Sequence, residues 1–98
     1  MDKYKVILVD DEEEVMDVIE HRICWKQMGF EVVGKAQNGV KALEISEKMQ
    51  PDVVITDIKM PYMDGLELAR NLKQDNPDMR TMTGESSLRN YVRRFVNA

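Results

Sequence analysis

Three aspartates stand directly after two short apolar runs, and they are the side chains most able to do chemistry. Asp10 and Asp11 follow residues 6–9, and Asp57 comes two positions after the apolar residues 53–55. Both runs are too short for helices and rich in β-branched residues, which is typical of strands buried on both faces of a parallel sheet. If the two strands are neighbours, their carboxyl ends bring the three carboxylates together, where open α/β sheets place their ligands.

Such a cluster predicts a particular chemistry. Each pair of carboxylates at ~4 Å repels by about 4 kcal/mol at an effective dielectric of ~20. Either one of the three holds a proton, or a cation lies among them. A small set of oxygen ligands with room for water favours Mg²⁺ over softer metals. A divalent ion beside an aspartate also attracts a phosphoryl group, and carboxylates are competent phosphoryl acceptors.

The rest of the chain predicts the elements that position these residues. Strands are expected at residues 4–9, 30–36, 53–57 and 79–84, and helices at 13–28, 39–49, 65–74 and from 86 or 87 onward. Gly29 is expected to end the first helix in a left-handed conformation, and Asp64 to cap the third. Gly34 and its charged neighbours favour an edge position for the second strand. This alternation predicts a parallel sheet with right-handed crossovers.

Helical spacing identifies the faces that should pack on the sheet. The expected buried residues are Val15, Val18, Ile19, Arg22 and Ile23 in the first helix, Val40, Ala42, Leu43, Ile45 and Met49 in the second, and Leu66, Leu68, Ala69 and Leu72 in the third. In the tail, Leu88, Tyr91, Val92 and Phe95 form a further amphipathic stripe. His21 has charged neighbours and is expected on the surface.

Composition narrows the class of protein. The 98 residues fit one domain, expected over residues 1–98, without repeats or a linker. With 14 basic and 18 acidic residues, the net charge of −4 argues against direct binding to nucleic acid. No apolar run approaches the ~20 residues of a membrane span. The single cysteine suits a reducing compartment, so we expect a cytoplasmic domain without membrane contact.

Three motifs in order resemble the receiver domain of two-component response regulators. They are the acidic pair Asp10-Asp11, the turn Asn38-Gly39, and the stretch from Asp57 through Met60-Pro61 to Asp64-Gly65. The residues around Trp25 are most similar to regulators with an AraC-type DNA-binding output domain. The resemblance implies a flavodoxin-like, doubly wound α/β fold with strand order 2-1-3-4-5. It is strongest over residues 3–80, and residues 81–98 depart from the family pattern.

The resemblance also implies a role for each matching residue. Asp57 would accept a phosphoryl group from the phosphohistidine of a sensor histidine kinase. Asp10, Asp11, Asp57 and the backbone carbonyl of Lys59 would bind Mg²⁺. Thr83 would be the switch hydroxyl that moves toward the phosphoryl group. Such a domain is a phosphoacceptor signalling module, not a conventional enzyme.

The chain departs from the family pattern at its C-terminal part. Receivers have a fifth strand that carries a lysine, usually followed by proline, and then a fifth helix, whereas no Lys-Pro pair occurs in this sequence. We therefore expect an incomplete receiver, truncated after its fourth helix, that self-associates through an uncovered helix face or sheet edge. The alternative interpretation is a receiver-like module that lacks the family lysine, is impaired in phosphorylation and serves interaction or dimerisation.

Two further alternatives remain at this stage. Asp10 and Asp11 could serve only to cap the first helix. A phosphatase of the haloacid-dehalogenase type would also use Mg²⁺ and an aspartate nucleophile. That class carries an Asp-x-Asp pattern after its first strand, whereas this chain has Asp10-Asp11-Glu12, so this reading ranks last.

Overall fold

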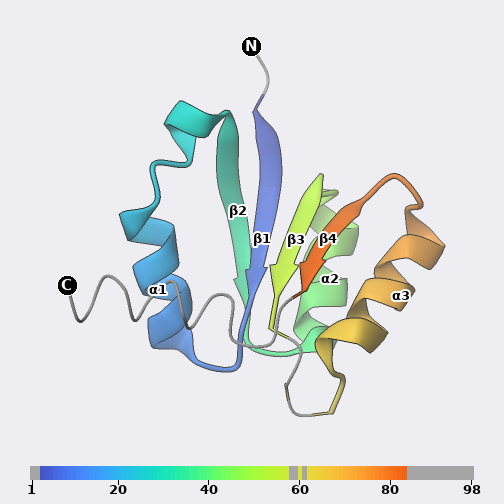
Figure 1. Ribbon diagram of the computed structural model, residues 1–98. Coiled ribbons are helices and arrows are strands. Elements are labelled where there is room, and N and C mark those ends of the chain that lie inside the picture. Colours follow the sequence, from blue (N-terminus) through green and yellow to red (C-terminus); the bar gives the residue numbers. More distant parts are fainter. Residues whose placement is uncertain (1–2, 58–59, 61, 84–98) are drawn as a thin grey trace.

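A four-stranded parallel sheet forms the centre of the computed structural model, which describes residues 3–57, 60 and 62–83 (Figure 1). Its strands lie in the order β2-β1-β3-β4, so the predicted edge position of the second strand is confirmed. All pairings are parallel. The strands are β1 (Tyr4–Val9), β2 (Phe30–Ala36), β3 (Val53–Thr56) and β4 (Arg80–Thr83).

Helices cover both faces of this sheet. Helix α1 (Glu13–Arg22) packs through Val15, Met16 and Ile19 on one face, where Val6 and Leu8 of β1 meet it. Helices α2 (Gly39–Met49) and α3 (Gly65–Asp75) lie on the other face and enclose Ile7, Val9 and Val54. Successive strand residues therefore pack into two separate cores, one on each face of the sheet, as a doubly wound α/β fold requires.

The first helix is shorter than the predicted span of residues 13–28. It ends at Arg22 because Ile23 adopts an extended backbone, and the chain then forms a short 3₁₀ helix, η1 (Lys26–Met28). The indole of Trp25 donates to the carbonyl of Ile19 and meets the ring of Phe30 edge-on, so this local packing replaces the last helical turns. Gly29 is left-handed as predicted (φ 85°), but it closes η1 rather than α1.

Some expected core positions are exposed. Val40 and Leu66 are each 50% exposed and Met49 is 37% exposed, and Arg22 also faces solvent. Helix α2 instead buries Gly39, Ala42 and Ser46. Leu43 and Ile45, the other predicted core residues of this helix, pack against the buried cluster and stay partly exposed.

Strand β3 also differs from the prediction that it is buried on both faces. Val54 and Thr56 are buried beneath α2 and α3, whereas Val53 and Ile55 on the other face are half-buried. Both side chains pack against the cluster that α1 forms with β1, but they lie at its margin and stay partly exposed.

Local signals at the third helix are confirmed. Asp64 is its N-cap, and its side chain accepts a hydrogen bond from the backbone N–H of Glu67 at 2.8 Å. The expected helix after residue 85 lies outside the described residues. No helix in the described part of the chain is long and apolar enough to cross a membrane.

Candidate functional site

The carboxyl ends of β1 and β3 meet at one edge of the sheet. Val9 pairs with Thr56 across these two strands, so the next residues, Asp10 and Asp57, leave the sheet side by side. The backbone N–H of Asp57 donates to the carbonyl of Val9 at 3.2 Å, and that of Asp10 donates to the carbonyl of Ala36 at 3.0 Å. These bonds extend the strand ladder by one residue and fix both backbones.

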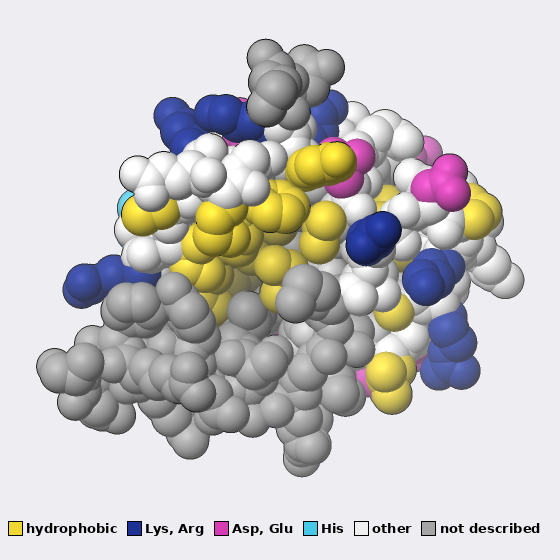
Figure 2. Space-filling view, turned by 45° about the horizontal axis from the view of Figure 1, so that its top comes forward, with side chains coloured by type: hydrophobic (Ala, Val, Ile, Leu, Met, Phe, Trp, Pro, Cys, Tyr) yellow, Lys and Arg dark blue, Asp and Glu magenta, His cyan; other side chains and the backbone are white. Residues whose placement is uncertain are grey.

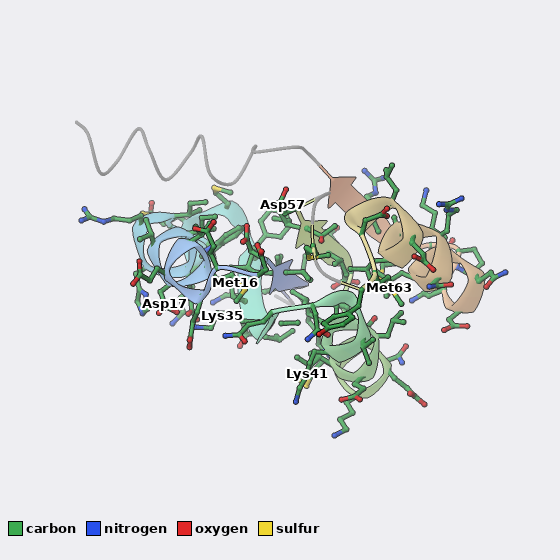
Figure 3. All side chains as sticks on the ribbon, turned by 90° about the horizontal axis from the view of Figure 1, so that it is seen from below. Met16, Asp17, Lys35, Lys41, Asp57 and Met63 are labelled. Carbon is green, nitrogen blue, oxygen red and sulfur yellow. The ribbon has the colours of Figure 1, made fainter. Side chains whose placement is uncertain are left out.

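The three predicted carboxylates lie together at this edge. Oxygen atoms of Asp10, Asp11 and Asp57 all fall within 4.8 Å of one another. Asp10 is fully buried and Asp57 is 3% exposed, whereas Asp11 is open to solvent. Figure 3 looks onto this edge and shows Asp57 at the end of β3. The prediction that the strand ends bring these residues together is confirmed.

Electrostatics and donor type make this cluster suited to a hard dication. Two unit charges 4.8 Å apart repel by about 3 kcal/mol at an effective dielectric of ~20, and a bound dication would reverse this penalty. All three donors are carboxylate oxygens, and the exposure of Asp11 leaves room for water. Mg²⁺ prefers few protein carboxylates together with water, so this donor set fits it.

Asp10 also shapes the start of the first helix. Its Oδ1 accepts a hydrogen bond from the backbone N–H of Glu12 at 2.9 Å, while Glu12 itself occupies the N-cap position of α1. This bond closes a local turn before the helix, and α1 has no side-chain cap, so the alternative that Asp10 or Asp11 serves only as its N-cap is wrong. His21 is exposed, as expected, and its Nδ1–H donates to the carbonyl of Asp17 at 2.7 Å.

Two further residues, Thr83 and Lys59, were predicted to belong to the site, and the structure describes only the backbone of Thr83. Thr83 is the last residue of β4, and its backbone pairs with Thr56, the residue before Asp57. The strand ends thus place Thr83 at the same edge of the sheet. The side chain of Thr83 and the whole of Lys59 lie outside the described residues.

Thr56 is a positioning residue that the sequence analysis did not identify. It is fully buried, and its hydroxyl donates to the backbone carbonyl of Asp57 at 2.9 Å. This bond orients the peptide that follows Asp57, where the chain leaves the sheet. A threonine within a β-branched run looks like an ordinary strand residue, so no sequence signal distinguished it.

Gly39 has a second role beside its turn. A Cβ atom at this position would lie 2.7 Å from the sulfur and 2.8 Å from the Cβ of Met63. Met63 belongs to the loop after Asp57 and lies over the start of α2 (Figure 3). The missing side chain therefore lets the loop that follows the site pack directly on helix α2.

Comparison with known proteins identifies the family. The profile of the response regulator receiver domain matches residues 6–97. The chain is 44% identical over 77 residues to the transcriptional regulatory protein YesN of Bacillus subtilis, covering 79% of this chain and 21% of that protein. It is 40% identical over 72 residues to a protein-glutamate methylesterase/protein-glutamine glutaminase of Hahella chejuensis, covering 74% of this chain and 20% of that protein. The chain thus spans about a fifth of the length of these two relatives.

Solved structures agree with this assignment. The receiver domain of AraT, a response regulator from Geobacillus stearothermophilus, superposes with a TM-score of 0.76 at 31% identity, over 96% of this chain and 74% of that chain. A two-component transcriptional regulator AraC from Clostridium phytofermentans gives a TM-score of 0.77 at 34% identity, over 94% and 72% of the two chains. The likeness to AraC-type regulators and the flavodoxin-like receiver fold are confirmed. The chain belongs to the receiver domain family of two-component response regulators.

Proposed function

We propose that this domain accepts a phosphoryl group on Asp57 from the phosphohistidine of a sensor histidine kinase, with Mg²⁺ bound by Asp10, Asp11 and Asp57. The observation that carries the proposal is the convergence of these carboxylates at the edge formed by β1 and β3. The carbonyl of Lys59 is proposed as a further metal ligand, and Thr83 as the switch hydroxyl.

The proposed step is a displacement at phosphorus. An oxygen of Asp57 attacks the phosphorus atom, forming a P–O bond while the P–N bond to the kinase histidine breaks. The bonding electron pair leaves on the imidazole nitrogen, which then takes a proton from solvent. When bound, Mg²⁺ supplies positive charge that offsets the charge on the phosphoryl oxygens. The hydrogen bond from Thr56 to the carbonyl of Asp57 holds the backbone of the acceptor in place during this step.

The proposed acceptor is held in a fixed position. Asp57 is 3% exposed and its backbone is bonded into the sheet ladder, so the group to be modified sits on a rigid part of the fold. Modification there would change charge beside β4 and Thr83, which begin the C-terminal part of the domain. On this proposal the domain is a cytoplasmic phosphoacceptor that signals and is not a conventional enzyme.

A beryllofluoride binding experiment tests the proposal. Beryllofluoride mimics a phosphoryl group on aspartate, and fluorine NMR should show a bound signal for the wild-type chain only when Mg²⁺ is present. Asp57→Asn should abolish the signal. Asp75→Asn is the matched control, because it removes an exposed carboxylate at the end of α3 and should leave the signal unchanged. Equal signals from wild type and Asp57→Asn would refute the proposal.

A second candidate is an interaction module that docks on a kinase without accepting phosphate. The departure of residues 81–98 from the receiver pattern is the observation that favours it. A folded wild-type chain that binds a kinase but forms no adduct with beryllofluoride or a phosphodonor would support this second function.

A further inference from the structure

A groove of about 710 Å³ lies between α2 and α3, which run side by side on one face of the sheet (Figure 1). Part of its lining is apolar, because the buried side chains of Leu72 and Met79 and the partly buried side chain of Leu43 border it. Val40 also lines the groove and is 50% exposed. The groove therefore offers apolar surface to an occupant.

The charged side chains that line this groove are all acidic. Glu44 and Glu47 come from α2 and Asp75 comes from α3, and all three are exposed. Of the described residues that line the groove, none is a lysine, an arginine or a histidine. Within the described part of the chain, the ion pairs involve Lys35 with Asp17 and Glu20 and none of these three carboxylates. The three carboxylates are therefore available to cationic groups of a partner.

Lysines of the same two helices lie on other surfaces. Lys41 and Lys48 of α2 line a smaller groove of about 420 Å³ beside β2. Lys73 of α3 lines a groove of about 880 Å³ beside β3, on the face where Figure 2 shows hydrophobic side chains gathered. A helix surface that only faces water ordinarily mixes charges of both signs. This separation of charge favours a positively charged occupant between α2 and α3.

We propose that the groove between α2 and α3 is a docking site for a basic amphipathic helix of a partner protein. The apolar residues of that helix would contact Val40 and Leu43. Its lysine or arginine side chains would pair with Glu44, Glu47 and Asp75. The inference concerns a surface away from the acidic cluster and does not rest on phosphoryl transfer.

The walls of the groove favour a helical occupant over an extended one. Helices α2 and α3 bond their backbone groups internally, so they offer no strand edge to an extended peptide, whereas a helix brings its own backbone bonds with it. Each wall has 11 residues and is about 16 Å long. A partner helix of about three turns would therefore span the groove.

Peptide binding followed by NMR tests the proposal. The probe is an acetylated and amidated helical peptide of about three turns, with leucine along one face and arginine on both sides of that face. Amide shifts should change along α2 and α3, and added salt should weaken binding. The same peptide with glutamate in place of arginine should not bind. Absence of binding at millimolar peptide, or shift changes confined to the edge at Asp10 and Asp57, would overturn the proposal.

A matched pair of charge variants locates the binding. Glu44→Gln combined with Glu47→Gln removes two charges from the groove and should raise the Kd of the arginine peptide about fivefold. Glu31→Gln combined with Asp78→Asn removes the same charge from exposed positions outside the groove and should leave the Kd unchanged. Equal effects of the two double variants would show general attraction to an acidic protein and would overturn the proposal.

A second pair of variants tests the apolar contact. Val40→Ser should raise the Kd about threefold, because a half-exposed side chain loses the apolar area that the peptide covers. Leu66→Ser is the control, because Leu66 is also 50% exposed but does not line the groove, and it should leave the Kd unchanged. A Kd that Val40→Ser does not raise would overturn the proposal of an amphipathic occupant.

A second copy of the chain is the competing occupant, since self-association is expected from the sequence. Sedimentation of the wild type and of the variant with Glu44→Gln and Glu47→Gln distinguishes the two. A wild-type monomer, or a dimer that persists in the variant, supports a partner of different sequence. A wild-type dimer that dissociates in the variant would assign the groove to a second copy and overturn the proposal.

Discussion

Gly34→Ala is predicted to loosen the contact between β2 and α2. An added Cβ at this position would lie 2.7 Å from Cγ2 of Ile45, well inside van der Waals contact, and 3.7 Å from Cγ1 of Ile7. Gly34 lies in the middle of β2, next to the irregularity in its register with β1. The sequence indicated only that this glycine suits an edge strand, whereas the structure shows that it makes space for a helix side chain.

The expected cost follows from how little Ile45 can move. Ile45 is β-branched and helical, so one χ1 rotamer dominates and rotation cannot carry Cγ2 away cheaply. Forcing a methyl group into such a contact costs about 1–3 kcal/mol. The substitution also lowers the conformational entropy of the unfolded chain, which offsets about 0.4–1 kcal/mol of this cost. We therefore expect the free energy of unfolding to fall by about 1–2 kcal/mol, and Tm by roughly 4–8 °C per kcal/mol.

A double-mutant cycle with Ile45→Ala isolates this contact. Ile45→Ala removes Cγ2 and costs stability by itself, but in its presence the new methyl of Gly34→Ala meets no clash. Urea unfolding should therefore show the double variant more stable than the sum of the two single effects by at least about 1 kcal/mol. Strictly additive effects, or a Gly34→Ala variant as stable as the wild type, would refute the reasoning.

Three further predictions concern the metal site, a helix cap and a surface ion pair. Mg²⁺ at ten times its Kd should stabilise the wild type by about 1.4 kcal/mol in thermal unfolding, and Asp11→Asn should lose most of this gain; an equal gain in the variant would contradict the metal site. Asp64→Ala should lower the free energy of unfolding by about 1 kcal/mol in urea, because the cap to Glu67 is lost, whereas Asp64→Asn keeps the acceptor and should cost only a few tenths. Hydrogen bonds to Glu20 and Asp17 raise the pKa of Lys35 above its ordinary value of 10.5. The charged lysine therefore stabilises the folded state fully below pH 10.5, and this stabilisation is lost as the pH rises through the higher pKa of the folded state. With a third of the side chain exposed, Lys35→Met should cost less than about 1 kcal/mol, and a cost that changes between about pH 6 and 9 would contradict this assignment.

Sequence patterns were sufficient to predict those parts of the fold that depend on the preferences of neighbouring residues. The buried run before Asp10 and the run before Asp57 identified the two central strands, and parallel pairing then placed their carboxyl ends together. The cap at Asp64 and the left-handed Gly29 were also visible, because each rests on the conformational preference of a single residue. These signals were enough to predict that the acidic cluster forms.

Features that depend on packing between elements were not visible in the sequence. The periodicity of the first helix continues past Arg22, but the contact between Trp25 and Phe30 ends it there. Val40 of α2 is half-exposed, because Gly39, Ala42 and Ser46 form the buried face of this helix. The role of Thr56 likewise depends on a hydrogen bond to a neighbouring peptide, which residue type alone does not indicate.

Phosphorylation by acetyl phosphate tests the central claim most directly. Intact-mass spectrometry of the wild-type chain with acetyl phosphate and Mg²⁺ should show the addition of one phosphoryl group, removable by hydroxylamine as an acyl phosphate is. The addition should be absent in Asp57→Asn and after chelation of the metal, and it should persist in Asp75→Asn. A wild-type chain that stays unmodified while folded, or an Asp57→Asn variant that is modified equally, would contradict the assignment of Asp57 as phosphoacceptor.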